Sequence, residues 1–232
     1  MTEVEPRWGV GDAVLAVFLA YGISSMVFLA IGSPKTATIA QNCLLTLPFW
    51  ILAIAVPIWA TVTKGNGPAV DLGLRIRPLD VLIGAGLGVF AQYAVGWGYQ
   101  LVTSDATVQK LSKPAETLAS SASDSWGKVL LVVTTVLVAP IAEELLYRGL
   151  LLRSLERRFA AVGAKRVVAW VGAIVLTGLV FAAMHFQALQ FVGLALFGMM
   201  CGALAVTTGR LAPAMAAHIA FNATAVAHLH IW

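Results

Sequence analysis

The sequence has little charge for its length. Of its 232 residues only 11% are Asp, Glu, Lys or Arg, whereas 59% are hydrophobic. Soluble globular domains carry about 25% charged residues. A chain of this length is also too small to bury so much apolar surface inside one water-facing domain. The composition therefore excludes an ordinary water-soluble domain and predicts that a lipid bilayer surrounds much of the chain.

Several other signals are missing. The two cysteines, Cys43 and Cys201, both lie in apolar stretches, so we interpret them as packing residues and predict no disulfide. No run of Lys and Arg with interleaved aromatic residues indicates nucleic-acid binding. The His-Glu-x-x-His signature of zinc proteases is absent. We expect no nucleic-acid partner, no cofactor and no metal.

Long uncharged stretches fill the space between the few charges, and a membrane span needs about 20 apolar residues. They predict an all-α fold, a polytopic bundle of transmembrane helices at roughly 10–32, 38–62, 80–102, 127–153, 167–187, 190–208 and 211–230. Only Gln187 and Gln190 divide the fifth span from the sixth, so the expected number is seven, or eight if one helix is short or re-entrant. The Ser-rich segment 103–125 is expected to be the longest polar loop. Residues 1–232 are expected to form a single membrane domain.

The basic residues are unevenly divided between the two sides of this seven-span arrangement. One side carries Arg7, Lys64, Arg75, Arg77, Arg153, Arg157, Arg158, Lys165, Arg166 and Arg210. The other carries Lys35, Lys110, Lys113 and Lys128. The positive-inside rule then predicts a multi-pass protein of the cell membrane with a cytoplasmic N-terminus. The short loops of this basic, mostly apolar chain favour a prokaryotic plasma membrane.

Two adjacent glutamates and an arginine interrupt the fourth span. Each charge in mid-membrane costs about 3 kcal/mol on insertion scales. Glu144 and Arg148 are four residues apart, so they share a helix face and can pair. We favour a structural role for this pair, because paired intramembrane charges commonly hold helices together. Glu143 is rotated by about 100° from Glu144 and has no charged partner one turn away, so it is the carboxylate available as a general acid or base.

Polar residues on the later spans complete a possible site. His185 follows Phe181 by one turn, and a histidine of this kind taken alone is more often a packing residue. His218 and Asn222 are also four apart, and both side chains can donate hydrogen bonds. Donors aimed at one point can stabilise an oxyanion, although interhelical hydrogen bonding is the simpler interpretation.

Taken together, the three patterns resemble the CPBP family of CAAX proteases and bacteriocin-processing enzymes, also called the Abi family, whose eukaryotic relative is the Ras-converting CAAX endopeptidase. The motifs read Glu143-Glu144-Leu-Leu-Tyr-Arg148, Phe181-Ala-Ala-Met-His185 and His218-Ile-Ala-Phe-Asn222, and the catalytic helices would span 127–225. The resemblance implies an intramembrane endopeptidase. Its water would be activated by Glu143 with help from His185.

The resemblance also implies roles for the other motif residues. His218 and Asn222 would stabilise the oxyanion, while Glu144, Arg148 and Phe181 would support the site. The implied substrate is a membrane-associated peptide or protein. No prenylated substrate is expected, because prenylated CAAX proteins are not expected in a prokaryote.

Other functions remain open at this point. Glu143, His185 and His218 are ligand types that suit zinc, which would make the chain a zinc-dependent intramembrane protease. Relatives of the family are also linked to bacteriocin immunity and to membrane scaffolding, roles that need the fold but not the Glu143 carboxylate. A transporter is a further alternative, since charge pairs and histidines mark proton relays, but the sequence has no repeat pattern of discontinuous helices.

The expected heights of the motifs raise a difficulty. Glu143 and His185 are equally far from a turn near Gly163, so an antiparallel helix pair would place them level with each other. His218 falls only about eight residues into its own span, close to the opposite membrane face if the helices are straight. The motifs can meet only if a helix is tilted, broken or displaced.

Overall fold

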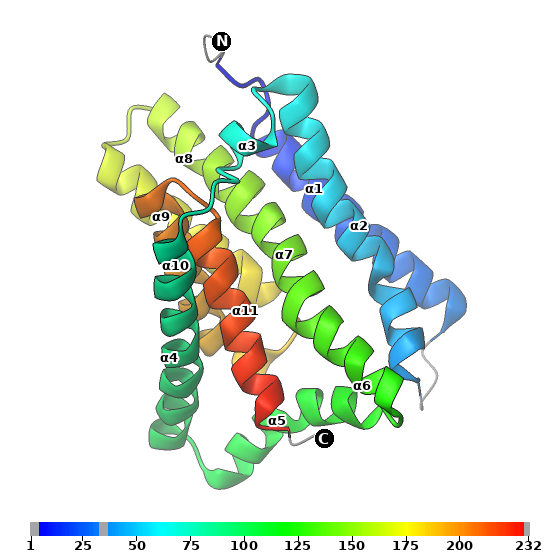
Figure 1. Cartoon of the computed structure of the whole chain (residues 1–232). Helices are drawn as coiled ribbons and strands as arrows, with labels where there is room; N and C mark the ends of the chain where they lie inside the picture. The colour runs from blue at the N-terminus through cyan, green and yellow to red at the C-terminus, as the bar shows by residue number, and fades with distance from the viewer. Residues whose placement is uncertain (1–4, 33–36, 230–232) are drawn as a thin grey trace.

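The described part of the chain consists of helices joined by turns and short loops, with no strand among these residues. The computed structural model describes residues 5–32 and 37–229, so Lys35 lies outside the described residues. The long helices and their neighbours are α1 (Val10–Ile31), α2 (Ile39–Lys64), α3 (Pro68–Asp71), α4 (Pro78–Val102), α5 (Asp105–Ser120), α6 (Ser125–Val132), α7 (Ala139–Glu144), α8 (Leu152–Ala161), α9 (Arg166–Ala183), α10 (Phe191–Thr208) and α11 (Ala212–Ala227). Figure 1 shows the long helices packed side by side as a bundle.

The predicted all-α membrane bundle is confirmed. Among the described residues, six helical stretches are long and apolar enough to cross a bilayer: Val10–Ile31, Ile39–Lys64, Pro78–Val102, Ser125–Ala161, Arg166–Ala183 and Ala188–Thr208. The seventh predicted span corresponds to α11, which has only 16 residues. The predicted division between the fifth and sixth spans is confirmed, since α9 ends at Ala183 and α10 begins at Phe191.

One helical stretch runs unbroken from α6 through α8 and carries the glutamate pair. Two π-helical segments interrupt its α-helical geometry, η1 (Val133–Val138) before the glutamates and η2 (Leu145–Leu151) after them. A π-helical turn inserts an extra residue and rotates the following side chains, and such turns are frequent at functional sites. The glutamate pair thus lies at the end of a single short α-helical segment, α7, between two widened turns.

The segment predicted as the longest polar loop is instead largely the helix α5. Its apolar residues Val108, Leu111, Ala115 and Leu118 recur every three or four residues, which gives the helix one apolar face. The high serine content of 103–125 masked this periodicity. In Figure 1, α5 lies across the end of the bundle, beneath α4 and α11, rather than along it. It contributes no fully buried residue.

Glycines let the helices around the site approach closely. A Cβ atom added at Gly88 would lie 2.0 Å from the carbonyl oxygen of Ala217, and one added at Gly84 would lie 2.3 Å from that of Pro213. Helices α4 and α11 therefore meet backbone to backbone, as small residues four apart allow in membrane proteins. Because Ala217 precedes His218, this contact fixes the part of α11 that carries the histidine.

The start of α11 is recessed into the protein. Leu211, in the connection from α10, is fully buried, and its N–H donates a 3.0 Å hydrogen bond to the carbonyl of Gly73. The segment around Leu72 and Gly73 covers this connection, and Leu72 is itself fully buried. The short α11 thus begins below the end of the bundle. His218 consequently lies deeper than a straight span starting at the membrane face would place it.

Candidate active site

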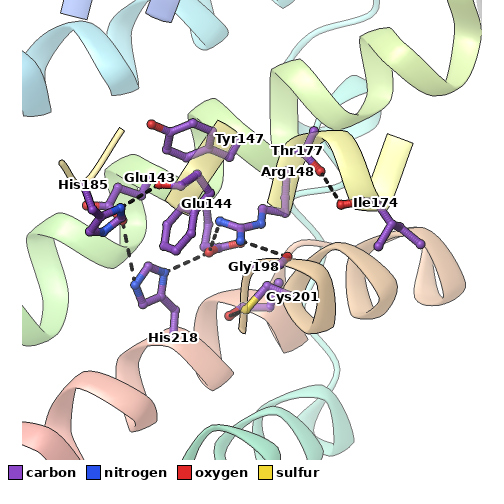
Figure 2. A network of polar contacts seen from close by, with 12 residues as sticks. Glu143, Glu144, Tyr147, Arg148, Ile174, Thr177, His185, Gly198, Cys201 and His218 are labelled. Atoms are coloured by element: carbon purple, nitrogen blue, oxygen red, sulfur yellow. Dashed lines mark hydrogen bonds and ion pairs between the residues drawn. The ribbon is translucent and has the colours of Figure 1, made fainter. Parts of the chain in front are cut away.

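Glu143 faces two histidines from two other helical elements. Its Oε2 lies 3.8 Å from Nε2 of His218 and 4.0 Å from Nε2 of His185. The Glu143 side chain is 14% exposed, and its Oε2 is buried without a hydrogen-bond partner among the described residues. Figure 2 shows the two imidazole rings converging on this carboxylate. Three polar atoms therefore surround one small region at separations slightly too long for direct hydrogen bonds.

The end of α9 orients His185. The last turn tightens, so the backbone N–H of His185 bonds to Ala182 and leaves the carbonyl of Phe181 without that partner. His185 Nδ1 then donates to the Phe181 carbonyl oxygen at 2.7 Å. The chain turns away at Phe186, which has a left-handed φ of 54°, an unusual conformation for a bulky residue. Because Nδ1 carries the donated proton, Nε2 of the neutral ring presents a lone pair toward Glu143.

A buried ionic network orients His218. Its Nδ1 lies 2.8 Å from Oε1 of Glu144, and the same oxygen accepts a 2.8 Å hydrogen bond from Nη1 of Arg148. Arg148 Nη2 also donates to the carbonyl of Gly198 on α10 at 3.0 Å. Glu144 and Arg148 are both fully buried. The ion pair expected from the i,i+4 spacing is therefore present, and it extends to α10 and α11 (Figure 2).

Asn222 lies one turn beyond His218 on α11. Its Nδ2 donates a 2.8 Å hydrogen bond to the carbonyl of Thr135 in the π-helical segment η1. A side-chain amide has two N–H donors, so this bond fixes the orientation of the amide without using both. Asn222 and His218 line the same cavity, as their shared helix face predicts.

Aromatic rings form an apolar wall behind the network. The ring of Phe181 lies 4.5 Å from the ring of His185 and 5.7 Å from that of His218, centroid to centroid. The guanidinium carbon of Arg148 lies 4.5 Å from the centre of the Phe181 ring, a cation–π contact. Phe197 of α10 packs against His218 at 5.1 Å. Phe181 thus supports both histidines and the buried arginine.

A cavity of about 960 Å³ connects these residues with one end of the bundle. Glu143, His185, His218 and Asn222 lie along it, and so do α5 residues that include Leu111 and Glu116. The amide of Gln190 donates to the carbonyl of Leu111 at 2.7 Å, which joins α5 to the start of α10. The cavity therefore extends from the glutamate to the end of the bundle opposite the basic loops.

Sequence reasoning identified the polar side chains that line the site but missed some of their partners. It did not predict the hydrogen bond between His218 and Glu144. Nor did it predict that the carbonyls of Gly198 and Thr135 accept hydrogen bonds, because backbone acceptors carry no sequence signal. It also missed a 2.7 Å hydrogen bond between the hydroxyls of Tyr21 and Tyr147. Tyr147 lies inside the first motif, but nothing in the sequence pairs it with α1.

The same geometry bears on whether the site could hold a metal ion. Within residues 5–32 and 37–229, no three His, Cys, Asp or Glu side chains are arranged so that they could hold a metal ion. Glu143, His185 and His218 instead surround a space between one carboxylate and two imidazoles.

The fold and site define a polytopic membrane protein with a glutamate–histidine cluster in a cavity between its helices. Residues 125–224 match the family model for the type II CAAX prenyl endopeptidase, Rce1-like. This segment contains all three motifs, and the match supports the CAAX protease family assignment that the resemblance predicted. No curated protein and no solved structure matches the chain.

Proposed function

We propose that the protein is an intramembrane endopeptidase in which Glu143 activates a water molecule. The observation that carries the proposal is the position of Glu143 Oε2, which lies 3.8 and 4.0 Å from the two histidine Nε2 atoms. Polar atoms separated by slightly more than a hydrogen bond are commonly bridged by water. A water between them would meet two or three polar partners, enough to hold it in place.

The reaction then follows from the donors and acceptors available. Glu143 takes a proton from the water with help from the Nε2 lone pair of His185. The water oxygen bonds to the carbonyl carbon of the substrate peptide, whose oxygen becomes an oxyanion. When the C–N bond breaks, the proton held by Glu143 passes to the departing amine. Such general acid–base catalysis accounts for about 10²- to 10⁴-fold in rate.

His218 and Asn222 are suited to stabilise the oxyanion. Because Nδ1 of His218 is directed to Glu144, its Nε2 can donate a hydrogen bond only when the ring is an imidazolium. The carboxylate of Glu144 compensates that positive charge. The second N–H of Asn222 supplies another donor along the same helix face. We assign Glu144 and Arg148 a positioning role, because they are fully buried and act through His218.

We propose that the substrate is a membrane-associated peptide or protein segment that enters from the end of the cavity lined by α5. The basic loops lie at the opposite end of the bundle. If those loops are cytoplasmic, as the positive-inside rule predicts, the cavity opens toward the non-cytoplasmic side.

The test is Glu143→Gln, which keeps the shape of the side chain and removes its basicity. Cleavage of membrane peptides is expected to fall at least about 100-fold, while the thermal unfolding midpoint of the purified protein stays unchanged. Membrane peptides are then compared between cells that express the unaltered protein and cells that express Glu143→Gln. The substrate is the peptide that accumulates uncleaved only in the variant cells.

Glu116→Gln is the matched control. Glu116 lines the same cavity but lies on the exposed surface of α5, so its substitution should leave cleavage intact. If Glu143→Gln retains the complete cellular phenotype, the protein acts as a scaffold or an immunity protein and the protease proposal fails.

A further inference from the structure

A second cavity lies at the basic end of the bundle, away from the proposed active site. Its volume is about 780 Å³. It is lined by the segment before α1, by α3 and the turn before it, by α8 and by the first turns of α9. None of the motif residues lines it. Three arginines do: Arg153, Arg157 and Arg166.

The guanidinium groups of these arginines are short of partners. Arg153 donates to the carbonyl of Gly209 at 3.0 Å, but its Nε is buried with no hydrogen-bond partner. Arg157 donates to the carbonyl of Trp8 at 2.7 Å. No ion pair joins any of the three arginines to a carboxylate in the part of the chain that the structure describes. Each guanidinium has five donors, and all three arginines line the cavity, so donors remain for a ligand bound there.

Two tryptophans hold the arginine side chains in place. The guanidinium carbon of Arg157 lies 3.5 Å from the ring centre of Trp8, and that of Arg166 lies 4.4 Å from that of Trp170. Arginine and tryptophan at the ends of membrane helices are typical of the headgroup region of a bilayer. If the basic end of the bundle lies at the membrane surface, the cavity is at the level of lipid phosphates. The two ring contacts restrict the side chains of Arg157 and Arg166 before any ligand binds.

The carboxylates of the cavity narrow the choice of ligand. Asp71 is already engaged, because its Oδ2 accepts hydrogen bonds from Trp8 Nε1 at 2.8 Å and from the backbone of Asn66 at 2.9 Å. Glu5 and Glu156 also line the cavity. A purely anionic ligand would be attracted by the arginines and repelled by these two glutamates. A ligand with a phosphate and a primary ammonium group complements both sets of charges.

We infer that this cavity binds the headgroup of an aminophospholipid of the phosphatidylethanolamine class. The arginines hold the phosphate, for which guanidinium is the preferred bidentate donor. Glu5 and Glu156 face the ammonium. Basic pockets between transmembrane helices bind lipid headgroups in this manner. Because the site is separate from Glu143, lipid binding does not depend on the proposed protease reaction.

The test uses the full-length chain in nanodiscs and native mass spectrometry. We expect one phosphatidylethanolamine to remain bound per chain after release from the nanodisc. Arg157→Gln and Arg166→Gln should each lower its occupancy about tenfold, because each removes a charge-assisted contact. Arg166 makes no hydrogen bond within the described chain and is exposed, so its substitution tests binding without disturbing the fold.

The matched control is Arg158→Gln, the same change at the next position of α8. Arg158 is exposed and does not line the cavity, so occupancy should stay unchanged. Glu156→Gln should weaken binding of phosphatidylethanolamine and strengthen binding of phosphatidylglycerol, which lacks the ammonium.

Three outcomes would overturn the inference. The first is equal retention of phosphatidylglycerol and phosphatidylethanolamine by the unaltered chain. The second is displacement of the bound phosphatidylethanolamine by inorganic phosphate, which would mean that the site binds a soluble anion rather than a lipid. The third is loss of lipid with Arg158→Gln as readily as with Arg166→Gln.

Discussion

His218 is bonded to Glu144 and not to Glu143, although the two glutamates are adjacent. Its Nδ1 lies 2.8 Å from Glu144 Oε1, whereas its Nε2 lies 3.8 Å from Glu143 Oε2. One imidazole therefore lies between a carboxylate that holds it and a carboxylate that it faces across the cavity. The two nitrogens of a single ring thus distinguish the adjacent glutamates: Glu144 bonds to His218, and Glu143 faces it.

Glu144→Gln should destabilise the protein, unlike Glu143→Gln. The substitution leaves the fully buried Arg148 without its counter-charge, and breaking a buried pair in this way costs about 3–5 kcal/mol. Thermal unfolding in detergent is expected to shift to clearly lower temperature, and cleavage should be lost. The double variant Glu144→Gln/Arg148→Met removes both charges and should recover stability but not cleavage. Full activity of the double variant would contradict the positioning role.

Gly88→Ala should impair the active site from a distance. The added methyl would lie 2.0 Å from the carbonyl oxygen of Ala217, so α11 must move away from α4 and carry His218 with it. We expect both a lower unfolding temperature and reduced cleavage. Gly86→Ala is the control on the same helix, since a Cβ there meets nothing within 4 Å. Equal behaviour of the two variants would mean that the α4–α11 contact does not position the histidine.

Cleavage should survive removal of metal ions, because the proposed water is activated by Glu143 and His185 alone. Protein dialysed against a strong chelator is expected to keep its rate, and elemental analysis should find zinc well below one equivalent per chain. A known zinc protease treated in parallel serves as the control. Loss of activity that zinc alone restores would favour the zinc-dependent alternative.

Cys43 offers a direct measure of which membrane face the cavity opens on. It is half-buried and lines the proposed active-site cavity, whereas Cys201 is fully buried. A membrane-impermeant maleimide is expected to label intact cells at Cys43. Labelling should be absent from Cys43→Ser, in which only the buried thiol remains.

A cysteine at the other end of the bundle completes this experiment. Thr63 is exposed at the end of α2 beside the basic Lys64. In the Cys43→Ser background, Thr63→Cys should be labelled only after the cells are opened. The reverse pattern would place the cavity on the cytoplasmic side and would leave the proposed chemistry unaffected.

Much of the helical architecture was accessible from the sequence alone. The predicted boundaries of the first, second, third and sixth spans agree with α1, α2, α4 and α10 to within two residues. The short η3 turn (Ala188–Gln190) precedes α10. The boundaries agree because uncharged runs between charges define where a chain can enter and leave a bilayer. The same rule led to the wrong prediction of a loop at 103–125. The amphipathic helix there is too polar overall to be recognised as a membrane span, and its many serines are not typical of a helix.

Within the site, the sequence determined which residues can interact along one helix. Spacing of four paired Glu144 with Arg148 and left Glu143 apart, and it placed Asn222 beside His218. These relationships are local, so helix geometry alone fixes them.

Only the tertiary structure decided how the motifs meet. The expected mismatch in height between His218 and Glu143 disappears because Leu211 is buried beneath Leu72 and Gly73, which starts α11 inside the bundle. It is fixed there by the glycine contact with α4. Contacts of this kind join residues that are far apart in the chain through backbone atoms, whose hydrogen bonds and close approaches are not encoded by side-chain periodicity. The sequence thus determined that Glu143 was the free carboxylate, while packing between helices decided that two histidines face it.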